Sequence, residues 1–314
     1  MSTVMFRGCA KRTIFMLSIS GITIAATMSS GLQKRADRFQ KKDAEHPGIL
    51  DPLAAAQRFR LSRYLPSTDL APFVEHHWTI HWDLRGQAPY VSEVLPHPSV
   101  NFAFTDERGW ITGVTTGKYT YDVRDVGLIV GTMFRPGGFF AYWRRPVTEL
   151  TDRVIPVTEV FPTAGDDFRH DLLAHDTDEG RIACIENLLH AHNAQADRNL
   201  SLVREALDAI AAQPDLRTVE RVAQSIHVSA RTLQSLFRRY VGVGLKWVLM
   251  RYRLIEAAER AARTPDPDWS AMAVDLGYTD QSHFVNDFRK LVGQPPHQYT
   301  QSIRSSPSSP LPPP

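Results

Sequence analysis

The sequence is poor in cysteine and carries little excess charge of either sign. Its 314 residues include two cysteines, Cys9 and Cys184, which are too few and too distant to predict a disulfide framework or a zinc site. A reducing compartment fits this cysteine usage. The 36 Lys and Arg residues nearly balance the 34 Asp and Glu residues, so the net charge is +2. The composition is that of a soluble globular protein with one large or two medium domains.

Catalytic and phosphate-binding motifs are also absent. The chain contains no G-x-S-x-G motif, no Walker loop and no paired motif carboxylates, so nothing in it supports a hydrolase. One stretch is rich in histidine, but it lacks H-E-x-x-H or any other tight metal-ligand spacing. We therefore predict no catalytic residue, cofactor or metal, and interpret these histidines as core or solvent-edge side chains. The stretch contains Glu75, His76, His77, His81, Glu93 and His97.

The first residues resemble a targeting segment only superficially. Three basic residues precede an uncharged run over residues 13–33, as in a signal peptide or a short membrane span. Serine and threonine dilute the apolar character of the run, and basic residues flank it on both sides, so charge does not set a topology. We interpret residues 1–45 as a disordered or mis-annotated leader and expect no membrane contact. A membrane anchor remains the alternative.

The region from residue 46 to residue 165 is predicted to be rich in β-strands. Residues 74–83 alternate, with Val74, His76, Trp78, Ile80 and Trp82 on one face. Shorter strands are expected within residues 90–105, 110–121 and 127–134, because turn signals separate them. The aromatic residues of this region are expected to be core, with the lining of a ligand pocket as the alternative. They are Phe102, Phe104, Trp110, Phe139, Phe140, Tyr142 and Trp143.

The C-terminal third contains one pattern twice, about fifty residues apart. Each copy has a polar residue, then Leu or Phe at +4, Phe at +8 and Gly at +13, which indicates one structural unit used twice. Apolar residues at helical spacing precede the polar residue, so each copy is predicted to be a helix, a turn and a second helix. This is the layout of a helix-turn-helix, whose second helix enters the DNA major groove. The repeated residues are Ser229, Leu233, Phe237 and Gly242, then Asp280, Phe284, Phe288 and Gly293.

Two further features of this third support the interpretation. Ser229 and Asp280 suit the N-cap of the second helix in each unit, since their side-chain oxygens can accept backbone N–H bonds. Residues 246–262 contain no Gly or Pro and predict a helix of roughly 25 Å. Such a strut would hold two recognition helices near one DNA turn, about 34 Å, apart. One molecule would then read two successive major-groove segments; the alternative is a plain helical bundle that reuses a hairpin.

These motifs resemble a known family. Residues 273–299, AVDLGYTDQSHFVNDFRKLVGQPPHQY, resemble the signature of AraC/XylS-type transcription regulators, and residues 229–239, SARTLQSLFRR, resemble the family's first recognition helix. The resemblance covers about a hundred C-terminal residues. It implies a cytoplasmic, sequence-specific regulator that binds double-stranded promoter DNA. RNA polymerase, an unknown small-molecule effector and a second subunit in a homodimer are the further partners that it implies.

The preceding region resembles a β-rich module of unassigned function that is often found before AraC-type domains. The motifs that carry this resemblance are YLP at 64–66, LPHP at 95–98 and FRPGG at 134–138. The predicted fold class is α+β, with a diverged cupin-like sensor or dimerisation domain at 46–165. A helical linker at 166–198 would either join domains, pair two subunits or pack on the sensor domain. Two helix-turn-helix units joined by a long helix follow at 199–303, then a disordered Ser/Pro tail at 304–314.

The resemblance also assigns residues to DNA contacts. Ser235 and Asn286 stand where longer basic residues are common in the family. Together with the acidic balance of the second unit, this weakens the base readout expected of that unit. Arg can bind guanine and Gln can bind adenine through two hydrogen bonds each. Base-reading positions map onto Arg231, Gln234 and Ser235 in the first unit, and onto Gln281, Ser282 and Asn286 in the second. Beyond the resemblance, we assign phosphate contacts to Arg238, Arg239, Lys246 and Arg289.

Charge is distributed unevenly between the two units. Residues 217–263 carry ten Arg and Lys against three Glu, a balance of +7, whereas residues 264–301 carry two basic residues against five Asp, a balance of −3. The first unit is therefore expected to contribute more to DNA binding. The alternative function is a cupin-like ligand-binding or enzymatic module whose helix-turn-helix half is vestigial. The basic first unit argues against it, because an unused DNA face need not keep its charge.

Overall fold

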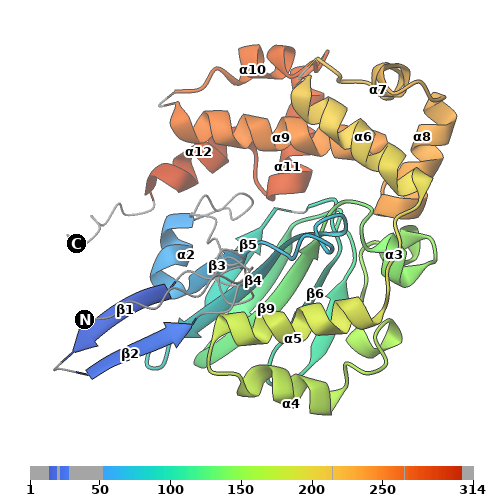
Figure 1. The fold of residues 1–314 in the computed structure, drawn as a ribbon. Helices are drawn as coiled ribbons and strands as arrows, with labels where there is room; N and C mark the ends of the chain where they lie inside the picture. Colours follow the sequence, from blue (N-terminus) through green and yellow to red (C-terminus); the bar gives the residue numbers. More distant parts are fainter. Residues whose placement is uncertain are drawn as a thin grey trace, which may run out of the picture.

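The structure is a computed structural model of the chain, and it describes residues 14–19, 22–27, 52–95, 97–213, 215–264 and 266–305. A β-rich half and a helical half lie one above the other (Figure 1), so the predicted α+β class with its β-rich part first is confirmed. Strands β1 (Ile14–Ile19) and β2 (Ile22–Thr27) pair in antiparallel fashion. The rest of the predicted leader, and most of the predicted tail, lie outside the described residues and stay predictions.

The β-rich half is built on one antiparallel sheet of six strands, in the order β10-β7-β6-β9-β4-β3. Strands β5 and β8 form a separate antiparallel pair. A short helix, α2 (Pro52–Arg58), precedes the sheet. The strands are β3 (Arg60–Tyr64), β4 (Val74–Asp83), β5 (Tyr90–Val94), β6 (Asn101–Phe104), β7 (Gly109–Thr112), β8 (Tyr119–Val123), β9 (Val126–Phe134) and β10 (Val154–Pro156).

The long strand β4 shows why the two sheet faces are covered differently. From His76 onward the predicted alternation holds, so Trp78 faces one side while His77 and Thr79 are buried on the other. The pairing with β9 shifts between Val74 and His76, as at a β-bulge. Val74 therefore packs in the main core, and its predicted place on the face of Trp78 is wrong. The prediction assumed that β4 pairs with its neighbour without a bulge, and a period-2 pattern in the sequence cannot test that assumption.

Helices α4 (Asp166–Ala174) and α5 (Asp178–Ala191) belong to the β-rich half. Leu172 and Ile185 are fully buried in the same core as Phe102 and Phe134 of the sheet. Figure 1 shows α5 lying across the sheet. The helices of the predicted linker thus pack on the β-rich domain, one of the roles that the sequence left open.

A buried polar network fixes the start of α5 on this face. Asp178 accepts hydrogen bonds from the Tyr64 hydroxyl at 3.1 Å, the Thr79 hydroxyl at 2.8 Å and His81 Nε2 at 2.8 Å. Burial by itself would raise the pKa of the Asp178 carboxyl, but these hydrogen bonds and the charge of His81 outweigh it. The pKa of Asp178 is therefore lowered, and its ionised form helps to hold α5 on the sheet.

The helical half contains the two predicted helix-turn-helix units. Figure 1 shows α9 crossing this half, with α7 and α8 towards one end and α10 and α12 towards the other. The predicted strut at 246–262 is the central part of α9. The elements are α6 (Arg198–Ala212), α7 (Val219–Ser225), α8 (Ala230–Leu236), a π-helix η4 (Phe237–Val241), α9 (Leu245–Arg263), α10 (Trp269–Asp275), α11 (Gln281–Val292) and α12 (Pro296–Ser305).

The first unit shares its core with the β-rich half. Buried residues of the sheet, of α6, α7 and α8, and of the start of α9 form one continuous apolar cluster. Phe140 of helix α3 (Phe140–Trp143) packs on Tyr240 of η4 with ring centroids 4.0 Å apart. Thr151 donates a 2.7 Å hydrogen bond to the Gly242 carbonyl. The first unit is thus fixed to the β-rich half by packing and by a hydrogen bond.

The second unit has a separate core. The second half of α9 packs with α10, α11 and α12 around Phe284 and Phe288, both fully buried. Leu95, just after β5, joins this cluster from the β-rich half and is only 5% exposed. The Lys118 side chain lies beside Gly293 at the end of α11. The second unit therefore touches the β-rich half near the β5–β8 pair.

Candidate functional site

The first candidate DNA-reading helix, α8, starts at a capped turn. Ser229 Oγ accepts a 3.0 Å hydrogen bond from the Thr232 backbone N–H, which satisfies one of the unpaired groups at the helix start. Leu233 is fully buried, so α8 turns one face inward and the other to solvent. Arg231, Ser235, Arg238 and Arg239 are exposed, and Gln234 is partly exposed. The predicted reading residues of this unit thus share one accessible surface with two arginines.

A π-helix follows α8 directly. The Gly242 backbone N–H donates to the Phe237 carbonyl at 3.1 Å, and Gly242 ends this turn with φ +100°. The π-helix turns Tyr240 toward Phe140 and places the Arg239 guanidinium over the same ring, 5.5 Å from its centroid. Arg239, predicted to contact phosphate, therefore also stabilises the contact with the β-rich half.

The second candidate reading helix, α11, has the same construction. Asp280 accepts a 2.8 Å hydrogen bond from the Ser282 backbone N–H. Gln281 Oε1 accepts a 3.0 Å bond from Ser270 of α10, so part of its hydrogen-bonding capacity is used within the unit. Phe284 and Phe288 form the buried face. The predicted DNA-facing residues Gln281, Ser282, Asn286 and Arg289 are all exposed.

The charge difference between the units is smaller at the surface than in the sequence. Arg251 is 1% exposed, and burial lowers the pKa of its guanidinium to about 10. Arg253 is partly buried and donates to the Arg217 carbonyl. Arg260 pairs with Glu256 at 2.5 Å. These basic residues belong to the core or to local pairs, so the +7 balance overstates the charge that faces DNA.

The acidic residues of the second unit are likewise engaged. Asp268 and Asp280 accept backbone N–H bonds at helix starts. Asp275 lies 3.6 Å from Arg260, and Asp287 accepts a 3.4 Å bond from the Tyr278 hydroxyl. Charges held at helix N-termini or beside arginine repel phosphate less than free carboxylates do. Local charge alone therefore separates the two units less sharply than the sequence predicts.

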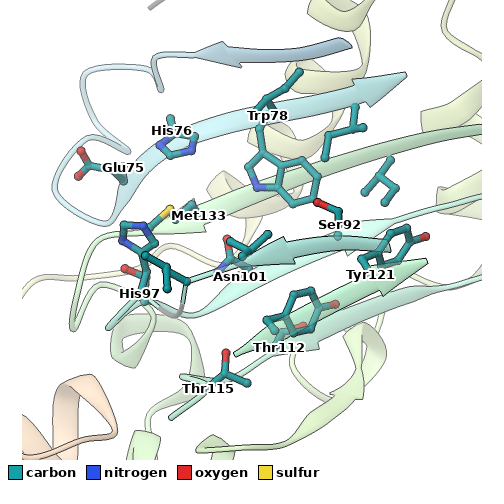
Figure 2. A pocket seen from close by; sticks show the side chains of 18 of the residues that line it. Glu75, His76, Trp78, Ser92, His97, Asn101, Thr112, Thr115, Tyr121 and Met133 are labelled. Atoms are coloured by element: carbon teal, nitrogen blue, oxygen red, sulfur yellow. The ribbon is translucent and has the colours of Figure 1, made fainter. Parts of the chain in front are cut away.

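A second candidate site is a cavity in the β-rich half. It has a volume of about 660 Å³, within the range of small-molecule sites. It lies between the sheet face opposite α5 and the β5–β8 pair, and Figure 2 shows side chains from both sides of it. Leu95 and Tyr252 of α9 also line it. The cavity thus touches both the β-rich half and the helix that joins the two reading units.

The register of the sheet arranges the cavity floor in two rows. The first row contains polar side chains with one methionine, and the second has two tryptophans separated by small residues. Figure 2 shows His76, Met133, Asn101 and Thr112 near one another and Trp78 beyond them. In the order in which neighbouring strands pair, the first row is His76, Met133, Asn101 and Thr112, and the second is Arg63, Trp78, Gly131, Ala103 and Trp110.

The histidine-rich stretch does not converge on one point. His76 and His97 line the cavity, whereas His77 and His81 face α5, where His77 Nε2 lies 3.4 Å from Glu186. In the part of the chain that the structure describes, no group of three or more His, Cys, Asp or Glu residues is placed to hold a metal ion. Nor does any described helix combine the length and the apolar character needed to cross a membrane.

The predicted aromatic set is divided between core and cavity. Phe102, Phe104, Phe139 and Tyr142 are core, and Trp110 lines the cavity. The other aromatic lining residues were missed as ligand contacts, because their convergence depends on the strand register and on the fold-back of β5–β8. The signal available in the sequence was the presence of two glycines in the strand predicted at 127–134. In the structure these glycines pair with tryptophans of β4. The missed residues are Phe59, Trp78, Trp82, Tyr119, Tyr121 and Tyr252.

The fold and the two capped, exposed helices define a paired helix-turn-helix protein with a β-rich partner domain. Residues 222–302 match the family described as "Helix-turn-helix domain", and residues 62–156 match a "Domain of unknown function (DUF6597)". These matches identify the C-terminal region as an AraC-type helix-turn-helix domain, preceded by the module of unassigned function. Both predicted resemblances are confirmed.

Individual relatives agree over part of the chain. Regulatory protein PocR of Salmonella typhimurium is 32% identical over 94 residues, which cover 29% of this chain and 30% of PocR. The HTH-type transcriptional regulator YtdP of Bacillus subtilis, itself uncharacterised, is 30% identical over 88 residues, 28% of this chain and 11% of that protein. The match thus spans less than a third of either relative. ToxT from Vibrio cholerae O395 aligns in structure over 69% of this chain and 94% of its own, with 9% identity and a TM-score of 0.35.

Proposed function

We propose that this chain is a sequence-specific DNA-binding transcription regulator of the AraC type that acts in the cytoplasm. The two recognition helices would read successive major-groove segments of promoter DNA. The β-rich half would modulate binding, through a small-molecule effector or through self-association, and would act on transcription by RNA polymerase. The relatives are regulators by name, so we infer a role without enzymatic activity.

The observation that carries the proposal is the first reading surface. Arg231 and Ser235 are exposed beside Gln234 on α8, whose opposite face is buried, and Arg238 is exposed on η4, which follows directly. Arg and Gln have the donor and acceptor geometry for guanine and adenine edges in the major groove. Exposed arginines next to them supply the sequence-independent attraction to phosphate. The surface thus combines the two kinds of contact that specific binding needs.

Selection of bound duplexes from a random library by the full-length protein tests this function. We expect enrichment of one motif with two conserved segments about one helical turn apart. A footprint on the selected site should protect two successive major-groove segments on one face of the DNA. Failure to enrich any sequence would refute the proposal, and protection of a single segment would refute reading by both units.

A further inference from the structure

Two tryptophans cover part of the cavity floor. A Cβ added at Gly131 would lie 2.4 Å from Trp78 Cζ2, and one at Gly127 would lie 2.3 Å from Trp82 Cζ2. Both indole rings therefore lie across the backbone of β9, and only glycine at these two positions leaves them room to do so. Together with Ile129, which lies between them on β9, they form a broad apolar floor.

Tyrosine side chains face this floor from the β5–β8 pair. Tyr119 and Tyr121 of β8 line the cavity, and Tyr121 packs against the cluster that contains Trp110. Figure 2 shows Trp78, Ser92 and Tyr121 around one part of the cavity. Aromatic rings from the sheet and from β8 in one lining stabilise a flat ring more than a puckered one of similar size, because stacked rings gain beyond the area that they bury. The shape and lining thus select for a planar apolar body.

Several polar groups of the lining gather at one end, while Ser92 lies near Trp78 and Tyr121. Asn101, Thr112 and His76 lie in the polar row, and Glu75 nearby is already paired with Arg135 at 2.8 Å. Amide, hydroxyl and imidazole groups can bind a hydroxyl or carbonyl group without adding a fixed charge. Arg63, a charged residue of the lining, lies in the aromatic row on the edge strand. This end therefore fits an uncharged hydrogen-bonding group.

Two lining residues connect the cavity to the second helix-turn-helix unit. Leu95 belongs both to the cavity wall and to the core of that unit. Tyr252 lies midway along α9, two residues before Leu254, which belongs to the same core. A ligand in contact with Leu95 and Tyr252 therefore acts on the attachment of the second unit, whereas the first unit is held by the continuous core.

We propose that the cavity binds a flat, mostly apolar ring molecule with one uncharged hydrogen-bonding end, and that Leu95 and Tyr252 transmit its binding to the second helix-turn-helix unit. The transmission part rests on the proposed DNA-binding function. The ligand part stands without it, because the cavity lies in the β-rich half.

Four matched probes test the ligand class by equilibrium dialysis against the full-length protein. They are 2-naphthol, its saturated counterpart decahydro-2-naphthol, naphthalene without the hydroxyl, and 2-naphthoate with a carboxylate. We expect 2-naphthol to bind about tenfold more tightly than the saturated alcohol, and several-fold more tightly than naphthalene and 2-naphthoate. Trp78→Leu should weaken 2-naphthol binding about tenfold. Val91→Ala, at an exposed position of β5, should leave it unchanged.

Each alternative result overturns a stated part of the ligand class. Equal or tighter binding of decahydro-2-naphthol refutes the flat body, and tighter binding of 2-naphthoate refutes the uncharged end. No binding of 2-naphthol up to about 1 mM refutes the class as a whole. A Trp78→Leu protein that unfolds is replaced by Trp78→Phe, which keeps a ring on the floor and should weaken 2-naphthol binding less than tenfold.

Transmission is measured as the ratio of DNA affinities with and without saturating 2-naphthol, on the selected duplex. We expect a change of at least fivefold in the wild-type protein. In Leu95→Ala and Tyr252→Ala the ratio should approach one, at ligand concentrations that dialysis shows to be saturating for each variant, while Val91→Ala keeps the wild-type ratio. A ratio of one in the wild-type protein, or an unchanged ratio in both variants, refutes transmission. Absence of any DNA binding refutes the proposed function instead, and leaves the dialysis result to decide the ligand class.

Discussion

Replacement of Gly242 and Gly293 by alanine should distinguish how the two helix-turn-helix units are attached. The two glycines occupy the same place in the repeat, at +13 from the N-cap, and both have positive φ, +100° and +88°. An alanine at either position meets the left-handed backbone cost, about 1–2 kcal/mol. Any difference between the two variants must therefore come from what the new methyl group touches.

The neighbours of the two glycines differ in their freedom to move. A Cβ at Gly242 would lie 3.1 Å from Val147 Cγ1 and 3.2 Å from the Val147 carbonyl oxygen. That carbonyl belongs to the 3-10 helix η2 (Val147–Leu150), which is packed in the shared core. At Gly293 the nearest atoms are in the Lys118 side chain, at 3.1–3.3 Å. This side chain is paired with Glu93 at 2.5 Å, but both side chains are partly exposed, so it can shift more easily than a packed backbone carbonyl. Gly242→Ala should therefore cost about 1–3 kcal/mol more than Gly293→Ala.

Thermal unfolding of the full-length protein, followed by tryptophan fluorescence, measures this difference. We expect Gly242→Ala to lower Tm several degrees further than Gly293→Ala, given about 2–4 °C per kcal/mol for proteins of this size. Gly86→Ala is the matched control, because Gly86 also has a positive φ, +76°, and nothing lies within 4 Å of its Cβ position; it should show the left-handed backbone cost alone. Equal losses at the two helix ends, or a larger loss at Gly293, would show that the first unit is not held by the shared core.

Three further predictions concern DNA readout and pH. Arg231→Ala should cost about 1–3 kcal/mol of binding free energy and relax preference at one base position; Asn286→Ala should cost less, and the reverse order in competition titrations would contradict this. Arg239→Ala should weaken binding to all sequences alike and reduce the salt slope by about one, so a change in preference would contradict its phosphate role. Asp178→Asn should destabilise the fold by about 3 kcal/mol. Because the folded pKa of Asp178 is lowered, its contribution is present above the unfolded value of about 3.9 and is lost as pH falls through the folded pKa; urea midpoints from pH 5 to 2 should fall more steeply in the wild type than in Asp178→Asn.

Much of the fold was predictable because local patterns determine it. The repeat fixed both helix-turn-helix units and their ends, since capping side chains and positive-φ glycines act within a few residues. The strand predicted at residues 74–83 has the same bounds as β4. The stretch at 246–262, which contains no Gly or Pro, predicts the connecting helix α9. The helix extends one residue further at each end. Each of these features depends on residues close together in the chain.

The features that were not predicted depend on contacts between distant segments. Arg251 counts as one unit of charge in the sequence, but the packing of α9 buries it. The bulge after Val74 is set by pairing with β9. The aromatic floor needs Trp78 to pair with Gly131, some fifty residues later in the chain. A composition or a period-2 pattern cannot supply such pairings, because they are properties of the assembled sheet.

The two helix-turn-helix units are therefore alike in sequence but differ in how they are attached to the β-rich half. The first unit ends in a π-helix that places Tyr240 on Phe140 and Gly242 on Thr151, so its reading helix moves only if the shared core moves. The second unit ends in a regular helix and meets the β-rich half through Leu95 and Lys118. A small free-energy change at the cavity acts on the weaker attachment first. In a protein that reads DNA with both units, such a change would alter their relative placement on the two groove segments while each unit keeps its own fold.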